Sequence, residues 1–288
     1  MPQNPNALTG NWFTEVCEEA GSAFSLKVRG KLFEEQSPFQ KVEVFETEKW
    51  GNLMVIDGYV MLTSRDNFLY HEMMSHPVLF THKAPKKVVI IGGGDCGTLR
   101  EVLKHPGVEK CWQIDIDEVV TRAAEKHFPE LCESNDDPRA ELLWIDGLKW
   151  VKDAAAESVD VVIVDSTDPI GPAEGLFGEK FYRDCIRMLA PGGILVQQSE
   201  SPLVHRKLLN EMRLAMRSAG FVDTRTLGFP QPVYPSGWWS ATMASKDMAL
   251  TNFRRADAVN RPFATEYYTA EIHDAALAAP AFFSREIR

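Results

Sequence analysis

VVIIGGGDCG (residues 88–97) is the stretch that decides the fold. Its first four residues are branched and apolar without alternation, which is typical of a strand buried on both faces of a parallel α/β sheet. The glycines that follow allow a sharp turn, and a helix-compatible run from Thr98 to Leu103 comes next. Strand, glycine loop and helix together predict the first βα turn of a nucleotide-binding sheet.

The glycine loop combines a common pattern with one unusual residue. Gly92, Gly94 and Gly97 match G-x-G-x-x-G, in which glycine supplies the turn, room for the ligand and close helix packing. That match alone is weak evidence. Asp95 lies inside the loop, and its carboxylate would repel a pyrophosphate held on backbone N–H groups. The loop therefore favours a nucleoside that carries positive charge.

Length, charge and cysteine content limit the class of protein. A chain of 288 residues, 44% of them hydrophobic, can bury a full core in one large domain plus a smaller one. The formal net charge of -10 argues against nucleic acid or an anionic membrane as a partner. The five cysteines are odd in number and lack C-x-x-C spacing, so neither a disulfide framework nor a zinc site is indicated. The start of the chain lacks the regions of a signal peptide, and no apolar run is long enough to span a bilayer, so we expect a cytoplasmic protein.

The chain divides into two parts. From Phe24 to Thr63 it alternates in short β-type runs, and Asp57-Gly58 between two of them is a hairpin signal. We expect a small antiparallel β-strand domain over residues 1–75. The remainder, 76–288, alternates strands with helices, which predicts an α/β fold with a doubly wound sheet of the Rossmann-like, class I methyltransferase-like kind. Ligands of such sheets lie at the carboxyl ends of the strands.

The expected elements of the second part follow from periodicity and turn signals. A helix over residues 70–80 leads into it. The expected strands are 88–91, 110–114, 140–145, 159–164 and 193–197, and the expected helices are 98–103, 118–128, 179–189 and 203–219.

Acidic residues follow each of the first four of these strands. In chain order they are Asp95, then Asp115 and Asp117, then Asp146, then Asp165 and Asp168. Aspartate is a common turn and cap residue, so any one of them could be structural, but acids at all four ends together indicate a site. Asp115 has the spacing of a ribose-binding acid. The segment from Asp165 to Gly178 has no periodicity and is typical of a lid over a substrate, although its Asp-Pro and Gly-Pro pairs could simply mark a turn.

Several runs resemble the signatures of the spermidine synthases, the polyamine aminopropyltransferases. They are GGGD (92–95), DSTDPIGPAE (165–174), YPSG (234–237), SPFQ (37–40), RDNFLYHEM (65–73), Tyr267-Tyr268 and Ile272-His273. The similarity extends from Trp12 to about Phe283. The aspartate-rich run at 165–174 is highly specific to this family, whereas many methyltransferases share the glycine loop.

The resemblance implies transfer of an aminopropyl group from decarboxylated S-adenosylmethionine to a diamine, typically putrescine, giving spermidine and methylthioadenosine. It implies neither a cofactor nor a metal, because the donor is a co-substrate. It also implies a homodimer or homotetramer assembled partly through the N-terminal strands. The oligomeric state itself cannot be derived from the residues.

The resemblance also assigns site residues by position. Donor binding would fall to Gln40, Tyr70, His71, Gly92, Gly94, Asp95, Gln113, Asp115, Asp146 and Gly147. Asp95 would lie near the aminopropyl amine, and Asp146 would meet the adenine amino group. Trp12, Asp168 and Tyr234 would bind the acceptor. Asp165 would accept the proton, with Tyr70 and Tyr234 beside it.

The chain departs from the family pattern at a few positions. Gln113 stands where the family usually has glutamate, so the ribose contact either moves to Asp115 or becomes a neutral hydrogen bond. Cys96 replaces a glycine or alanine. Trp238 and Trp239 either shape the acceptor pocket or are ordinary core aromatics on the next strand. Putrescine, cadaverine, agmatine and longer polyamines all remain open as acceptors, because apolar pockets separate such chain lengths by only about 1 to 3 kcal/mol.

Three other functions share parts of the pattern. A class I methyltransferase would use the same loop and sheet, but Asp95 would repel the carboxylate of S-adenosylmethionine. A nicotinamide-dependent dehydrogenase is compatible with the glycines but has no evident hydride-transfer partner here. A non-catalytic polyamine-binding protein could use the same acidic pocket without turnover.

Overall fold

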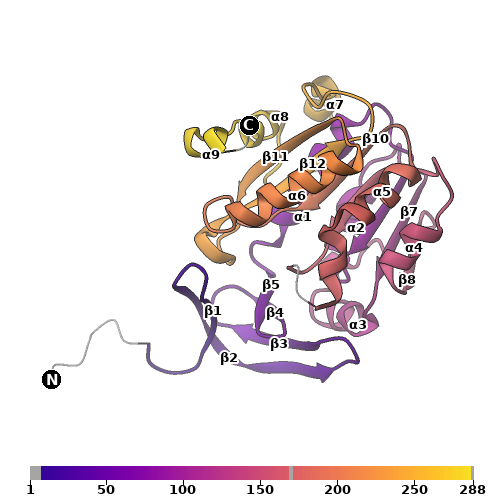
Figure 1. Ribbon diagram of the computed structural model, residues 1–288. Coiled ribbons are helices and arrows are strands. Elements are labelled where there is room, and N and C mark those ends of the chain that lie inside the picture. Colours follow the sequence, from indigo (N-terminus) through magenta and orange to yellow (C-terminus); the bar gives the residue numbers. More distant parts are fainter. Residues whose placement is uncertain (1–7, 169–170, 287–288) are drawn as a thin grey trace.

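The computed structural model describes residues 8–168 and 171–286, which form two β-sheets with helices around the larger one (Figure 1). The smaller sheet is antiparallel, in the order β1-β2-β3-β4-β5. Its strands are β1 Trp12–Cys17, β2 Ser22–Gln36, β3 Lys41–Thr47, β4 Asn52–Ile56 and β5 Tyr59–Thr63.

The predicted hairpin joins β4 to β5. Ile56 pairs with Tyr59 across a two-residue loop, and both loop residues have positive φ, 50° at Asp57 and 90° at Gly58. Positive φ at both positions is what a tight two-residue hairpin needs, so Asp-Gly fits here and the prediction is confirmed. Apolar residues of β3 and β4, among them Val44 and Met54, then pack against helix α3 (Glu118–His127) of the larger unit.

The larger sheet has seven strands in the order β11-β12-β10-β9-β6-β7-β8. Its strands are β6 Lys87–Gly92, β7 Lys110–Asp115, β8 Ala140–Trp144, β9 Val159–Asp165, β10 Leu189–Gln198, β11 Asp223–Pro230 and β12 Trp238–Ser245. The five strands from β10 to β8 are parallel, and β12 and β11 are added antiparallel at one edge. The run Val88 to Ile91 lies in the centre and is at most 2% exposed, which explains its lack of alternation.

Helices cover both faces of this sheet. One face packs on α1 (Asn67–Thr81) and α2 (Gly97–Leu103), with α8 (Ala270–Leu277) beside them, and the other face packs on α5 (Glu179–Met188) and α6 (Arg206–Ala219). The remaining helices are α4 Gly147–Asp153, α7 Arg255–Val259 and α9 Ala281–Glu286, with 3-10 helices η1 Pro129–Leu131, η2 Gly171–Phe177 and η3 Pro235–Gly237. In the described ranges, no helix combines the length and the apolar character needed to cross a bilayer.

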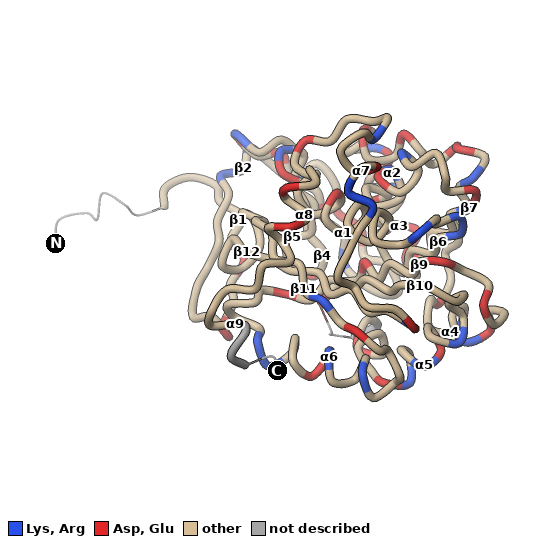
Figure 2. Tube along the Cα trace, turned by 90° about the horizontal axis from the view of Figure 1, so that it is seen from above, with Lys and Arg blue, Asp and Glu red and all other residues tan. Residues whose placement is uncertain are grey.

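The doubly wound α/β fold with an N-terminal antiparallel sheet is thus confirmed, with local differences. Helix α6 begins at Arg206, three residues later than expected. Helices α4, α7, α8 and α9 and strands β1 and β11 were not predicted, and β12 was expected only as one interpretation of Trp238 and Trp239. Part of the expected lid forms η2, while Pro169 and Ile170 of the same segment lie outside the described residues. Basic and acidic residues are interspersed along the chain in the view of Figure 2, without a basic stripe on that side.

A buried carboxylate ties the C-terminal segment to α1. Glu72 is 1% exposed and accepts hydrogen bonds from the backbone N–H groups of Glu266, Tyr267 and Tyr268, at 2.7, 2.9 and 2.7 Å. Three donors satisfy a charge that would otherwise be expensive to bury. These bonds fix the helix that carries Tyr70 and His71.

Candidate active site

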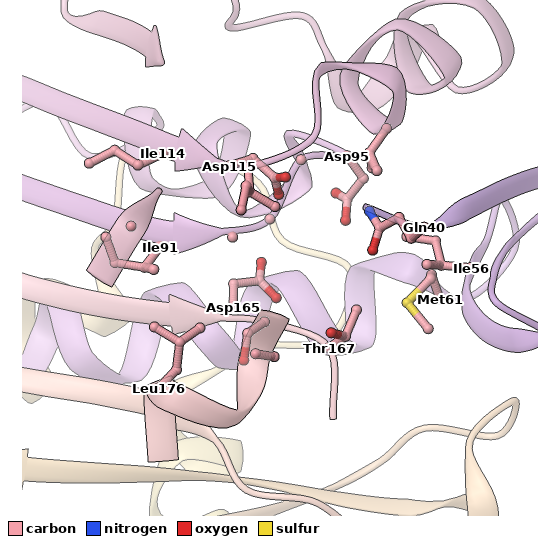
Figure 3. A pocket seen from close by; sticks show the side chains of 18 of the residues that line it. Gln40, Ile56, Met61, Ile91, Asp95, Ile114, Asp115, Asp165, Thr167 and Leu176 are labelled. Atoms are coloured by element: carbon pink, nitrogen blue, oxygen red, sulfur yellow. The ribbon is translucent and has the colours of Figure 1, made fainter. Parts of the chain in front are cut away.

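A cavity lies at the carboxyl ends of β6, β7 and β9, where the N-terminal sheet closes over the larger sheet (Figure 3). It holds about 1000 Å³, its open mouth included. Eleven of the predicted site residues line it: Gln40, Tyr70, His71, Gly92, Gly94, Asp95, Asp115, Asp146, Gly147, Asp165 and Tyr234. Strand ends that are distant in sequence therefore meet at one edge, as the parallel sheet requires.

The glycine loop packs directly on the end of β9. Gly92 has φ +84, and a Cβ there would stand 2.1 Å from the carbonyl oxygen of Asp165, so no other residue fits without moving the backbone. The Gly93 N–H donates to the same oxygen at 2.7 Å. At Gly97 a Cβ would overlap the imidazole of His71. The loop thus holds Asp165 and His71 close to it.

Asp165 is a buried carboxylate that accepts hydrogen bonds from two hydroxyl groups. Tyr70 donates to its Oδ1 at 2.7 Å, and Thr98 donates to its Oδ2 at 2.6 Å. Burial raises the pKa of Asp165, and the neighbouring Asp95 raises it further, while His71 opposes both. Burial also raises the pKa of the Tyr70 hydroxyl well above its usual range, so this group stays protonated and remains a donor.

Asp95 forms an ion pair with His71 at the cavity wall. The His71 Nε2 lies 3.1 Å from Asp95 Oδ1, which also accepts from the Gly97 N–H at 2.7 Å. Burial alone would lower the pKa of His71, but the carboxylates of Asp95 and Asp165 together outweigh it and the net pKa is raised. Figure 3 shows the Asp95 carboxylate facing Gln40 across the cavity.

Asp115, Gln113 and Asp146, which were expected around the nucleoside, have different environments, and so has Asp117, the other acid that follows the second expected strand. Asp115 lines the cavity, and burial raises its pKa to about 6. Gln113 lies beneath the loop instead, where its Nε2 donates to the Gly93 carbonyl and its Oε1 is buried without a hydrogen-bond partner. Asp146 caps α4 by accepting from Leu148 N–H at 2.9 Å through Oδ1. Asp117 has a structural role, since it caps α3 and accepts from the Ser37 hydroxyl at 2.7 Å.

A second, smaller cavity adjoins the first. The two share five lining residues, which are Met61, Tyr70, Ser166, Thr167 and Tyr234. Asp168 and Glu15 line the second cavity, and burial raises their pKa values to about 8 and about 6. The buried Glu200 contributes to the shift at Asp168, and it lies 3.1 Å from Nδ1 of His205. Both cavities are therefore acidic, and they meet at the two tyrosines.

Of the three tryptophans singled out from the sequence, only Trp239 lines one of the two cavities. Trp12 does not line either cavity; its indole donates to the Thr9 carbonyl at 2.9 Å, and its acceptor-binding role stays a prediction. Trp239 lines the second cavity, with its ring centroid 4.7 Å from that of Tyr234. Trp238, in contrast, packs toward Gly228 and the ring of Phe282.

Sequence reasoning missed three groups in this region. Glu200 follows β10 as the other acids follow their strands, so extending the same rule to the fifth strand would have found it. Glu15 lies on β1, a strand that was not expected. Thr98 gave no signal, because a hydroxyl at the start of a helix is common for structural reasons.

Two family models match the chain. Residues 67–255 match the model described as "Spermine/spermidine synthase domain", and residues 11–64 match the model described as "Spermidine synthase tetramerisation domain". Together they cover both sheets and the cavities between them.

Curated relatives and solved structures agree with these models. A polyamine aminopropyltransferase of Thioalkalivibrio sulfidiphilus is 63% identical over 98% of this chain and 99% of its own length. One of Methylococcus capsulatus is 64% identical over 96% and 97%. Among solved structures, a spermidine synthase in complex with the transition-state analogue AdoDATO has a TM-score of 0.93 at 34% identity, covering 100% of this chain and 98% of that one. The spermidine synthase of Thermotoga maritima has a TM-score of 0.91 at 34% identity, covering 100% and 97%.

Proposed function

The chain belongs to the spermidine synthase family and is a polyamine aminopropyltransferase, and from this premise we propose its substrates and the roles of its site residues. The donor is decarboxylated S-adenosylmethionine and the acceptor is putrescine. The products are spermidine and methylthioadenosine.

The observation that carries this proposal is that two acidic cavities meet at Tyr70 and Tyr234. The donor carries a sulfonium and an ammonium, and a diamine carries two ammonium groups, so both substrates match the charge of their cavities. Asp165 lines the larger cavity and accepts from Tyr70, which lines both, so the acceptor nitrogen would approach the carbon next to sulfur beside it. Because the two cavities adjoin, they can hold the donor and the acceptor side by side, which is the geometry that transfer of a group between them requires.

In this proposal the larger cavity holds the donor. Asp95 binds the aminopropyl ammonium, and Asp146 meets the adenine amino group. Asp115 reaches the cavity whereas Gln113 does not, which favours Asp115 for the ribose hydroxyls. Gln40, His71, Gly92, Gly94 and Gly147 complete the donor wall.

Catalysis must overcome the charge of the acceptor amine. An alkyl amine with a pKa of about 10.4 must lose a proton before it attacks, which costs roughly 4 to 5 kcal/mol at pH 7. Carboxylates near the amine stabilise its charged form, so binding and activation oppose each other. We assign the two tasks to different groups: Asp168 anchors the far amine as a cation, while Asp165, directly or through Tyr70, Tyr234 or a water, takes the proton from the attacking one.

Mass spectrometric product analysis tests this function. The enzyme is supplied with decarboxylated S-adenosylmethionine and, separately, putrescine, cadaverine, agmatine and spermidine. We expect methylthioadenosine together with spermidine from putrescine. A clear preference for carboxylated S-adenosylmethionine would favour a methyltransferase, and no methylthioadenosine with any amine would favour a non-catalytic polyamine-binding protein.

Acceptor affinity is expected to depend on pH through Asp168. Its pKa of about 8 means that the carboxyl group of the empty site is neutral below that pH. Putrescine remains a dication over this range, so its binding must displace the proton; affinity should fall about fivefold from pH 8 to pH 7 and rise only about twofold further above pH 8. Calorimetric titration with putrescine in the presence of methylthioadenosine measures this. Equal affinity at pH 7 and pH 8.5 would contradict it, and Asp168→Asn should remove the dependence.

We also propose a homo-oligomer, a dimer or tetramer, assembled partly through the N-terminal sheet. The support is the match of residues 11–64 to a tetramerisation domain. The proposed division of the chain is a β-strand domain over 1–75 and a catalytic domain over 76–288, with its boundary inside α1. Light scattering on the purified protein should give two or four times the 32.4 kDa of one chain, and a monomer at micromolar concentration would exclude the proposal.

The compartment proposed for the enzyme is the cytoplasm. All five cysteines are free thiols, which fits a reducing environment. Cell fractionation with antibodies against the protein tests this, and recovery from an oxidising compartment would contradict it.

A further inference from the structure

Thr98 is a buried residue whose hydroxyl reaches the centre of the site. It is the second residue of α2, directly after the glycine loop, and it is fully shielded from solvent. Its Oγ1 lies 2.6 Å from Oδ2 of Asp165. A carboxylate accepts but cannot donate, so the threonine hydroxyl is the donor of this bond.

The two oxygens of Asp165 face different surroundings. Oδ2 lies against the glycine loop, where a Cβ on Gly93 would stand only 2.8 Å from it. Oδ1 accepts from Tyr70, which lines both cavities. The bond from Thr98 therefore holds Oδ2 against the loop, whereas Oδ1 is the oxygen next to the tyrosine that lines both cavities.

Charged and titratable groups surround Asp165 from several elements. Tyr70 and His71 face it from α1, Asp95 faces it from the glycine loop, and Tyr234 approaches from the segment before η3. Burial and Asp95 raise the pKa of Asp165, whereas His71, Thr98 and Tyr70 lower it. Within residues 8–168 and 171–286, Thr98 is the hydroxyl that bonds to Oδ2 and favours the ionised form, as Tyr70 does at Oδ1.

We propose that Thr98 is a positioning residue for aminopropyl transfer, which holds Oδ2 of Asp165 so that an ionised Oδ1 faces the attacking amine. This inference rests on the proposed role of Asp165 as proton acceptor. In the step, one amine N–H bond breaks and the proton passes to Oδ1. The nitrogen lone pair forms the new N–C bond while the C–S bond breaks, and its electron pair stays on sulfur in methylthioadenosine.

The test compares pH profiles of turnover for Thr98→Val, Thr98→Ser and the wild type. Valine has the shape of threonine but leaves Oδ2 buried without a donor, which raises the pKa of Asp165, so that a higher pH is needed to ionise it. Turnover should therefore fall on the acidic side, with the acid limb shifted up by about one pH unit, and should recover at high pH. Serine restores the hydroxyl and should return the limb toward its wild-type position.

A matched control separates this effect from general damage. Thr81→Val removes another buried threonine hydroxyl, which bonds to the Pro77 carbonyl within α1, and should leave the pH profile unchanged. Methylthioadenosine affinity and the thermal midpoint show whether the donor cavity and the fold persist in Thr98→Val. If that variant does not fold, Thr98→Ala removes the same hydroxyl.

The outcomes are distinguishable from a failure of the proposed function. If Asp165→Asn is inactive but Thr98→Val keeps the wild-type acid limb, Thr98 has no positioning role and the inference is overturned. If turnover of Thr98→Val falls by the same factor at every pH, the inference is overturned as well. If Asp165→Asn keeps normal turnover, the proposed role of Asp165 itself fails.

Discussion

Replacing Asp165 with asparagine is expected to lower turnover 100-fold or more. The amide has nearly the same shape, but it cannot take a proton from the acceptor amine, and general-base assistance is typically worth 10²- to 10⁴-fold. Asp165 has no evident substitute, because Asp95 is paired with His71 and Asp168 lies in the second cavity. Single-turnover measurements with saturating donor and putrescine would isolate the chemical step.

Two controls accompany this measurement. Asp136→Asn changes an exposed aspartate that lines neither cavity and should leave turnover unaltered. Methylthioadenosine should bind Asp165→Asn within a few-fold of its wild-type affinity, since it lacks the reacting amine. Near-normal turnover of Asp165→Asn would show that the proton leaves by another route.

Replacing Asp95 with asparagine is expected to weaken donor binding roughly 30-fold to several thousand-fold. Removing one partner of a desolvated charge pair costs about 2 to 5 kcal/mol, because the ammonium group left behind remains buried without its counter-charge. The discrimination against S-adenosylmethionine should shrink at the same time, since the carboxylate of that ligand would no longer meet a negative charge. Competition binding with both ligands measures the two effects together.

Methylthioadenosine provides the control for Asp95→Asn. It shares the nucleoside and the sulfur but has no ammonium group, so its affinity should change little. An equal loss of affinity for methylthioadenosine and for decarboxylated S-adenosylmethionine would mean that the substitution disturbs the glycine loop through His71 rather than removing a charge contact.

The sequence was most informative where backbone geometry leaves few options. The apolar run Val88 to Ile91, followed by glycines, is typical of a strand buried on both faces, and Asp57-Gly58 supplies the positive φ values of a tight hairpin. The antiparallel edge strands β11 and β12 depend on pairing between distant segments, and nothing in their local pattern indicates their neighbours. Likewise β1 takes its partner from β2, and its own residues alternate weakly.

The residues of the site were likewise predictable from the sequence only in part. Acids at strand ends could be found from the sequence because the parallel sheet brings those ends together, which is why Asp95, Asp115, Asp146 and Asp165 meet in one cavity. The position of a residue at a strand end does not indicate where its side chain points. Gln113 is at the expected position, yet its amide turns beneath the loop and bonds to Gly93.

Hydrogen bonds between distant parts of the chain also bear on how activity is acquired during folding. The Tyr234 hydroxyl donates to the carbonyl of Met61, 173 residues away, and Glu72 reaches residues 266–268. Contacts of such sequence separation tend to form late, because closing a long loop costs entropy before the contact repays it. A refolding chain should therefore regain its helices well before it regains turnover, so that recovery of activity reports the final closure of the N-terminal sheet and the C-terminal segment onto the core.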